Sequence, residues 1–135
     1  IDFAVDKNGR RTEESLFSFP MNKKIWDVGH ETVEIFKEHI NNAKNLFMKG
    51  PLGYSEIPEF SYGTVAILKS ISLLSKKKKV FTLLGGGHLS TTLKKYKIQN
   101  NFSYISTSGG ALISFLSGKT LPGIEALELS AKRFF

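Results

Sequence analysis

The sequence predicts an α/β fold built on a parallel β-sheet, and two observations carry this prediction. Short apolar runs of β-prone residues alternate with longer stretches of helical periodicity, and glycines cluster where three of these runs end. Strands that alternate with helices are joined by right-handed crossovers into parallel sheets. The chain has 135 residues, which is the size of one ordinary domain.

Four apolar runs have the length of buried strands. They cover residues 3–5, 46–48, 80–84 and 102–105. The segment 6–14 is polar and contains Gly9, so we expect it to form a surface loop or hairpin.

The first helical stretch has a single apolar face, and Thr32 is its candidate N-cap residue. The residues of this face are Val33, Phe36, Ile40 and Ala43. A second stretch, over residues 65–75, has apolar residues on two sides. Such a broad apolar surface is typical of a helix that neighbouring elements cover well.

Three more helices are expected toward the C-terminus. They fall near residues 90–96, near residues 109–116, and after Pro122. Gly118 is the candidate C′ residue of the second of these, because glycine adopts the left-handed conformation that ends many helices.

The composition excludes several classes of protein. With 41% hydrophobic and 23% charged residues the chain is globular, and no apolar run approaches the roughly 20 residues that cross a bilayer. Cysteine is absent, which excludes disulfides and a cysteine nucleophile, and His30, His39 and His88 lack the spacing of a zinc site. The chain begins with isoleucine and its methionines are Met21 and Met48, so we expect it to come from the middle of a longer protein.

The formal net charge of +7 is concentrated in part in two lysine clusters. They are residues 76–79 and the group Lys94, Lys95 and Lys97. Basic clusters attract nucleic acid, phosphate ligands or acidic membranes. Few aromatic residues interleave with them, so we interpret the first cluster as a solvated turn and expect no nucleic-acid partner. A basic nucleic-acid-binding protein remains an alternative.

Glycine-rich junctions follow three of the predicted strands. They are Gly50 with Gly53, the run 85–87, and Gly109 with Gly110. Ligands of open α/β sheets bind beyond the carboxyl ends of the strands, and a following helix N-terminus offers unpaired N–H groups to an anion. Each junction alone could be a tight strand-to-helix turn, but three at one sheet edge predict an anion site, most naturally for nucleotide phosphates.

Five sequence motifs follow one another along the chain. The first two are Asp27-Val28-Gly29 with Thr32 (compare D-I-G-P-x-T), and Gly50-Pro51-Leu52-Gly53-Tyr54-Ser55-Glu56 with Phe60 and Gly63-Thr64 (compare N-G-P-x-G-x-x-E…F…G-T). The other three are Gly85-Gly86-Gly87-His88 (compare G-G-G-D/H), Phe102 through Ala111 (compare F-S-H-I-S-T-G-G-G-A), and Gly118-Lys119 with Leu121-Pro122-Gly123 (compare G-K-x-L-P-G). In this order they resemble the motifs of the phosphoglycerate kinase family. The motifs cover nearly the whole chain, and His88 together with the stretch 115–118 resembles archaeal members.

This resemblance implies a Rossmann-like, three-layer α/β/α fold with a parallel sheet, as the C-terminal part of a two-domain kinase. Residues 1–135 would be the C-terminal portion of its nucleotide-binding domain. The N-terminal phosphoglycerate-binding domain and the early strands of the nucleotide domain have no counterpart in this chain.

The activity implied is a step of glycolysis and gluconeogenesis, the reversible phosphoryl transfer from 1,3-bisphosphoglycerate to ADP, which gives 3-phosphoglycerate and ATP. The nucleotide would be bound with Mg²⁺. We expect the full-length enzyme to be a cytoplasmic monomer without a membrane partner, and the isolated segment to be inactive.

The resemblance also implies which residues form the site. Gly87, Thr107 and Gly110 would be catalytic, Glu56 would accept hydrogen bonds from ribose hydroxyls, and Pro51 with Gly53 would line the nucleoside pocket. The expected nucleotide-binding residues are Lys49, Gly50, Pro51, Gly53, Glu56, Gly85, Gly86, Gly87, His88, Ser106, Thr107, Gly109 and Gly110. The metal ligands stay unassigned.

Three positions depart from the family pattern. Lys49 stands where Asn is common, and His88 stands where many members have Asp, although neutral imidazole is a poor ligand for magnesium. Ser108 replaces the first glycine of a triplet, which a serine tolerates only if its φ is negative. These departures leave open an alternative, a catalytically impaired nucleotide-binding relative.

Overall fold

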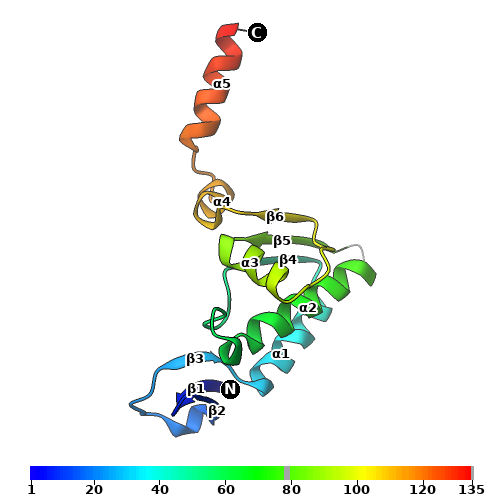
Figure 1. The fold of residues 1–135 in the computed structure, drawn as a ribbon. Coiled ribbons are helices and arrows are strands. Elements are labelled where there is room, and N and C mark those ends of the chain that lie inside the picture. Colours follow the sequence, from blue (N-terminus) through cyan, green and yellow to red (C-terminus); the bar gives the residue numbers. More distant parts are fainter. Residues whose placement is uncertain (78–79, 135) are drawn as a thin grey trace.

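A computed structural model describes residues 1–77 and 80–134 as two three-stranded sheets joined by helices (Figure 1). Lys78 and Lys79, which belong to the predicted lysine turn, lie outside the described residues. One sheet is parallel and the other is antiparallel. Among the described residues, no helix is both long enough and apolar enough to cross a membrane.

The parallel sheet confirms the α/β prediction. Its strands are β4 (Asn45–Lys49), β5 (Phe81–Gly85) and β6 (Tyr104–Ser106), in the order β4-β5-β6. Helix α2 (Tyr62–Lys77) connects β4 to β5, and α3 (Gly87–Lys95) connects β5 to β6. Each connection is therefore the expected crossover from one parallel strand to the next.

The core lies between this sheet and the helices α1 (His30–Asn41), α2 and α3. Two clusters of buried residues fill it, Val33, Ile40, Ile67, Ile71, Leu74 and Val80 in one, and Leu68, Leu84, Leu89, Leu93 and Ile98 in the other. Helix α2 contributes to both clusters, which explains the apolar residues on two of its sides. The prediction that this helix is well covered is confirmed.

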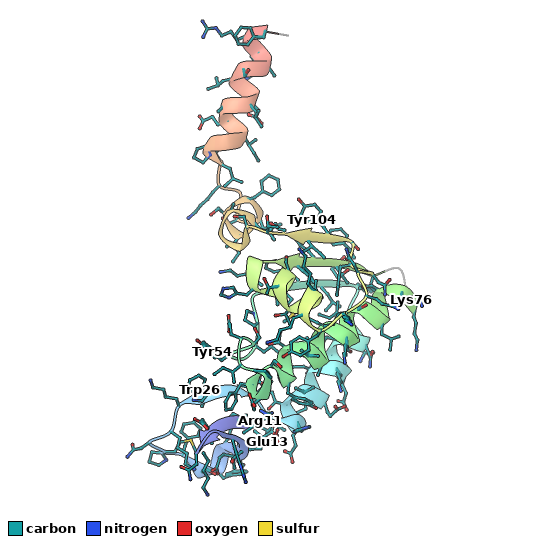
Figure 2. All side chains as sticks on the ribbon, viewed as in Figure 1. Arg11, Glu13, Trp26, Tyr54, Lys76 and Tyr104 are labelled. Carbon is teal, nitrogen blue, oxygen red and sulfur yellow. The ribbon has the colours of Figure 1, made fainter. Side chains whose placement is uncertain are left out.

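The opposite face of the sheet is open in this chain. The register pairs Phe47 with Leu83 and Leu83 with Tyr104, so these three residues lie on one face. Phe47 is 48% exposed and Tyr104 is 58% exposed. Figure 2 shows Tyr104 at β6, which is an edge strand of this sheet. The helices α1, α2 and α3 pack on the other face, and Leu112 of α4 (Gly109–Leu116) reaches the Gly85 end of this one.

Residues 3–5 do not join the parallel sheet, which corrects the simple alternation that we expected. They belong to β1 (Asp2–Lys7), the central strand of an antiparallel sheet with the order β2-β1-β3. Its partners are β2 (Arg10–Ser15) and β3 (Ile25–Val28), and the latter was not predicted. The hairpin expected at 6–14 is confirmed, and its turn residues Asn8 and Gly9 both have positive φ, as tight hairpins require.

The N-cap prediction at Thr32 was wrong. Helix α1 begins at His30 and its N-cap residue is Gly29, which has no side chain to cap the helix. The carboxylate of Asp2 takes this role from β1, since it accepts the N–H groups of Glu31 at 3.0 Å and of Thr32 at 2.7 Å. The capping residue is 30 positions away in sequence, so local patterns cannot reveal it.

The C-terminal elements follow the predicted boundaries closely. Helix α4 runs over Gly109–Leu116, and Gly118 has the positive φ of 78° expected of its C′ residue. Helix α3 begins at Gly87, three residues before the predicted start. Helix α5 (Pro122–Phe134) buries none of its described residues and extends away from both sheets (Figure 1). Two short 3₁₀ helices, Leu16–Ser18 and Pro58–Phe60, complete the fold.

Candidate functional site

The three glycine-rich junctions meet at one edge of the parallel sheet. The register aligns Lys49 with Gly85 and Gly85 with Ser106, which are the last residues of the three strands. The backbone ladder continues one step further, because the Gly50 N–H donates to the Gly85 carbonyl at 3.0 Å and the Gly86 N–H donates to the Ser106 carbonyl at 2.9 Å. Segments far apart in sequence therefore form a continuous surface here.

Neighbouring atoms crowd the space that a side chain would need at two glycines of this edge. A Cβ on Gly109 would lie 3.2 Å from Cε of Lys49 and 3.4 Å from Cα of Gly86. A Cβ on Gly85 would lie 2.9 Å from Cδ2 of Leu112. Gly86 also has a φ of 118°, in the left-handed region that favours glycine. Close packing and backbone conformation together explain the glycines.

Two helices begin at this edge with open N-termini. The N-cap residues are Gly86 for α3 and Ser108 for α4, and neither makes a side-chain cap hydrogen bond in the described chain. The first N–H groups of a helix have no partner within the helix, and the helix dipole favours an anion there. The φ of Ser108 is −111°, so serine is accommodated at this position without backbone strain.

The surface of the two helix starts is accessible. Gly87, Thr107 and Gly110 are exposed, whereas Gly109 is buried beneath them. The Ser106 hydroxyl accepts the Ser108 N–H at 3.3 Å and stabilises the turn into α4. The predicted catalytic residues thus lie at the N-termini of α3 and α4, near the Lys49 side chain.

Glu56 and His88 approach each other from different segments. Glu56 lies on the loop between β4 and α2, and its Oε1 is 3.6 Å from Nδ1 of His88 at the start of α3. The Glu56 carbonyl also accepts a hydrogen bond from Lys95 Nζ at 3.2 Å. Both side chains are exposed. The two form an ion pair only when the imidazole is protonated.

Pro51 and Gly53 lie on the turn that leaves β4. This turn runs toward the antiparallel sheet, where Gly53 packs against Asp27 and the backbone of Phe60. Asp27 is 2% exposed, and its burial raises its pKa against the hydrogen bonds from Gly63 and Val28 and the charge of Arg11. Asp27 opens one of the five sequence motifs, but it is not among the residues predicted for the site.

The residues at this edge do not form a metal cage. Within residues 1–77 and 80–134 no group of three or more His, Asp or Glu side chains could hold a metal ion. Glu56 is the carboxylate near His88, and imidazole suits magnesium poorly. Magnesium is typically bound by one or two carboxylates together with substrate phosphates, so this donor set fits a metal that arrives with a nucleotide.

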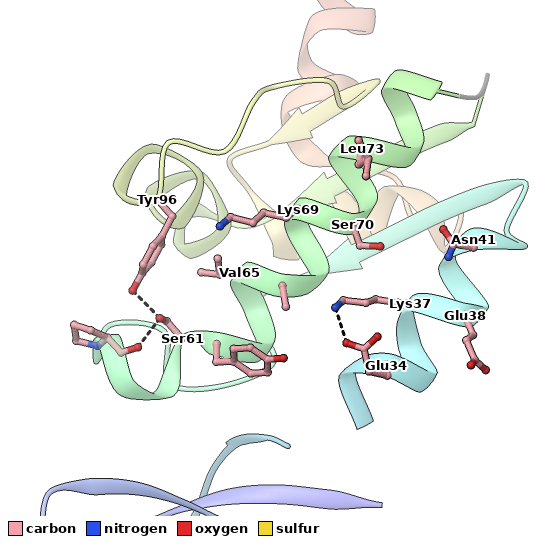
Figure 3. Close-up of a pocket in the computed structure, with 13 residues that line it drawn as sticks. Glu34, Lys37, Glu38, Asn41, Ser61, Val65, Lys69, Ser70, Leu73 and Tyr96 are labelled. Carbon is pink, nitrogen blue, oxygen red and sulfur yellow. Dashed lines mark hydrogen bonds and ion pairs between the residues drawn. The ribbon is translucent and has the colours of Figure 1, made fainter. Parts of the chain in front are cut away.

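A separate cavity lies away from the sheet edge, between α1 and α2 (Figure 3). Its volume is about 770 Å³, and Lys37 and Lys69 are among its lining residues. Near one end, Ser61 Oγ and Tyr96 OH are 2.6 Å apart, and Lys37 pairs with Glu34 at 2.6 Å. None of the glycine-rich junctions lines it. The site residues predicted from the sequence lie at or beside the sheet edge, and none of them lines this cavity.

Comparisons with known proteins agree with this geometry. A family model described as phosphoglycerate kinase matches residues 1–119. Phosphoglycerate kinases of Methanothermus fervidus and Thermococcus sibiricus are 41% and 37% identical, over 98% and 99% of this chain and 31% and 32% of theirs. The crystal structure of phosphoglycerate kinase from Pyrococcus horikoshii OT3 superimposes with a TM-score of 0.85 at 38% identity, covering 98% of this chain and 33% of that one. The structure from Coxiella burnetii gives a TM-score of 0.77 at 31% identity, covering 92% and 32%.

Proposed function

The chain belongs to the phosphoglycerate kinase family, and from this premise we propose that it carries the nucleotide side of a kinase active site. The enzyme would transfer a phosphoryl group reversibly between 1,3-bisphosphoglycerate and ADP, giving 3-phosphoglycerate and ATP in glycolysis. The observation that carries the proposal is the convergence of three glycine-rich junctions and two open helix N-termini at one sheet edge.

The chain spans about a third of the length of the curated relatives that it matches. We therefore assign the whole activity to a longer polypeptide, in which residues 1–135 are the C-terminal portion of the nucleotide-binding domain. The phosphoglycerate would be held outside this chain. Its arginines support this division, since Arg10 and Arg11 lie in β2 and Arg133 lies in the last turn of α5, away from the glycine-rich edge.

Phosphoryl transfer depends on positioning and on stabilising charge more than on covalent chemistry. The N–H groups at the starts of α3 and α4 would supply preorganised donors for the transferring phosphoryl group, next to Gly87, Thr107 and Gly110. Lys49 would add a point charge at the same edge. Glycine at these positions lets the backbone itself approach the phosphates.

The rest of the nucleotide would extend toward the β4–α2 loop. Glu56 would accept hydrogen bonds from the ribose hydroxyls, and its contact with His88 supports a position beside the phosphates. Pro51 and Gly53 would line the nucleoside pocket. Magnesium would enter as part of the magnesium nucleotide substrate. We expect this enzyme to be a cytoplasmic monomer.

A coupled assay of the full-length protein tests this function. With magnesium ATP and 3-phosphoglycerate we expect sustained turnover, measured through NADH oxidation by a coupling dehydrogenase. Absence of turnover in a folded protein would reject the assignment as an active kinase.

A second candidate is a nucleotide-binding relative with impaired catalysis, which Lys49, His88 and Ser108 favour because they depart from the common family pattern. It predicts ADP binding by calorimetry without turnover in the same assay. The two measurements together separate the two candidates.

A further inference from the structure

The turn after β4 is hydrogen-bonded to a buried hydroxyl group on α2. Thr64, in the first turn of α2, is fully buried. Its Oγ1 accepts the N–H groups of Leu52 at 3.0 Å and of Gly53 at 3.4 Å. Leu52 and Gly53 are the third and fourth residues of the segment 50–54, which carries Gly50 and Pro51 at the sheet edge.

The start of α2 is in turn fixed to the antiparallel sheet. Oδ2 of Asp27 accepts the Gly63 N–H at 2.9 Å, and Oδ1 of Asp27 accepts the Val28 N–H at 2.9 Å. A Cβ on Gly63 would lie 2.6 Å from Oδ1 of Asp27, and a Cβ on Gly53 would overlap the same carboxylate. The carboxylate therefore fills the space between the turn and the helix.

A third contact pins the far end of the segment. The Tyr54 N–H donates to the Trp26 carbonyl on β3 at 2.8 Å, and the two aromatic rings meet edge to face with centroids 5.2 Å apart. Figure 2 shows Trp26 and Tyr54 side by side between the antiparallel sheet and the rest of the chain. The turn is thus attached to α2 on one side and to β3 on the other.

We propose that Thr64 is a positioning residue for nucleotide binding, and that Asp27 holds in place the first turn of α2, which carries Thr64. This inference rests on the proposed nucleotide site. Thr64 binds backbone N–H groups of the turn and Asp27 packs against Gly53 from the side of the antiparallel sheet, so both act through the turn. Loss of the Thr64 acceptor frees two N–H groups, allows Gly50 and Pro51 to move, and weakens the fit to the nucleoside.

The test compares Thr64→Val with Thr64→Ser in the full-length enzyme. Valine keeps the volume and removes the acceptor, whereas serine keeps the hydroxyl. We expect Thr64→Val to raise the KM and the calorimetric Kd for ADP about fivefold to tenfold, as for the loss of one or two ordinary hydrogen bonds. The kcat and the KM for the phosphoglycerate substrate stay within about twofold, and Thr64→Ser behaves as the wild type.

Thr82→Val is the matched control. Thr82 is also fully buried and accepts a backbone N–H, that of Ser103 at 2.9 Å, but it lies near the start of β5, at the other end of the strand from the edge. Its substitution removes a similar bond and should lower the melting temperature without changing the KM for ADP. This separates positioning from a general loss of stability.

Equal ADP affinities in Thr64→Val, Thr64→Ser and wild type would overturn the inference, as would equal losses of affinity in Thr64→Val and Thr82→Val. If Thr64→Val does not fold, Asp27→Asn decides, because it keeps the shape and removes one acceptor. We expect a smaller increase in the Kd for ADP, and an unchanged Kd overturns the inference. A wild-type enzyme that neither binds ADP nor turns over fails the proposed function itself, which is a different result.

Discussion

At the scale of single residues, Gly110 tests the role of the α4 N-terminus. It is exposed at the second position of α4, and a Cβ there would meet no described atom within 4 Å. We expect Gly110→Val to lower kcat/KM in the full-length enzyme by at least about tenfold, because a side chain would block the approach of phosphate to the backbone. The melting temperature should change little.

Gly123→Val is the matched control for this substitution. Gly123 is the second residue of α5, and a Cβ there also meets nothing within 4 Å. The substitution makes the same change in helix propensity at the same position of a helix, but away from the sheet edge. Equal activity in the two variants would argue against a phosphate site at the start of α4.

Asp27 gives the protein a pH-dependent term in its stability. Burial raises its pKa above the ordinary value of 3.8, although Gly63, Val28 and Arg11 act in the opposite direction. The folded state then holds the proton more tightly than the unfolded state. The contribution of Asp27 to the free energy of unfolding therefore falls as the pH rises from about 4 through its folded pKa. We expect the unfolding free energy of the wild type to fall relative to Asp27→Asn across that range, and the difference to be constant above it. Urea unfolding at a series of pH values measures this, and a difference that is flat or grows in favour of the wild type would contradict the raised pKa.

The sequence shows the glycines of the candidate site but not the residues that support them. Gly86 has a positive φ that favours glycine, and neighbouring atoms crowd the position of a side chain at Gly85 and Gly109. All three glycines follow recognisable strands. Thr64 and Asp27 act on partners 11 to 36 positions away. Such contacts exist only once the two sheets are placed, so composition and periodicity cannot predict them.

At the scale of elements, α2 packs against the parallel sheet and contributes to both buried clusters. Leu68 is fully buried in the cluster that joins α2 to β5 and α3. We expect Leu68→Ala to lower the free energy of unfolding by about 2–5 kcal/mol, through lost burial and the cavity that remains. Denaturant unfolding of the protein measures the change.

Leu73→Ala, on the same helix, is the control for this prediction. Leu73 is 52% exposed, so its truncation should cost less than about 1 kcal/mol. Equal costs for the two variants would mean that α2 does not pack on the sheet through the face described here.

Elements with a strong periodic pattern were predictable, and elements set by distant contacts were not. The strands β4 and β5 and the helix α4 follow from apolar runs and glycine boundaries. Strand β3 was missed because it is only four residues long and depends on pairing with β1. The same pairing takes residues 3–5 out of the parallel sheet, a choice that their apolar character does not reveal.

At the scale of the whole molecule, the proposed function gives this chain one side of a reaction that needs two. Phosphoryl transfer requires donor and acceptor to be held in line, with charge stabilised from both directions. The open helix starts would offer donors for the nucleotide, while Phe47 and Tyr104 on one face of the parallel sheet and the whole of α5 remain exposed. We expect a purified chain of residues 1–135, checked for contaminating host kinase, to show no phosphoryl transfer in the coupled assay. Sustained ATP-dependent turnover by this segment would show that the rest of the enzyme is dispensable.

The most direct test of the central claim is amide hydrogen exchange of the full-length enzyme with and without saturating ADP. The claim is that the glycine-rich edge of the parallel sheet binds the nucleotide through its backbone. We predict slower exchange in the presence of ADP over residues 49–56, 85–88 and 106–110, and little change along the cavity between α1 and α2. Unchanged exchange at the three junctions, with protection at that cavity instead, would contradict the account.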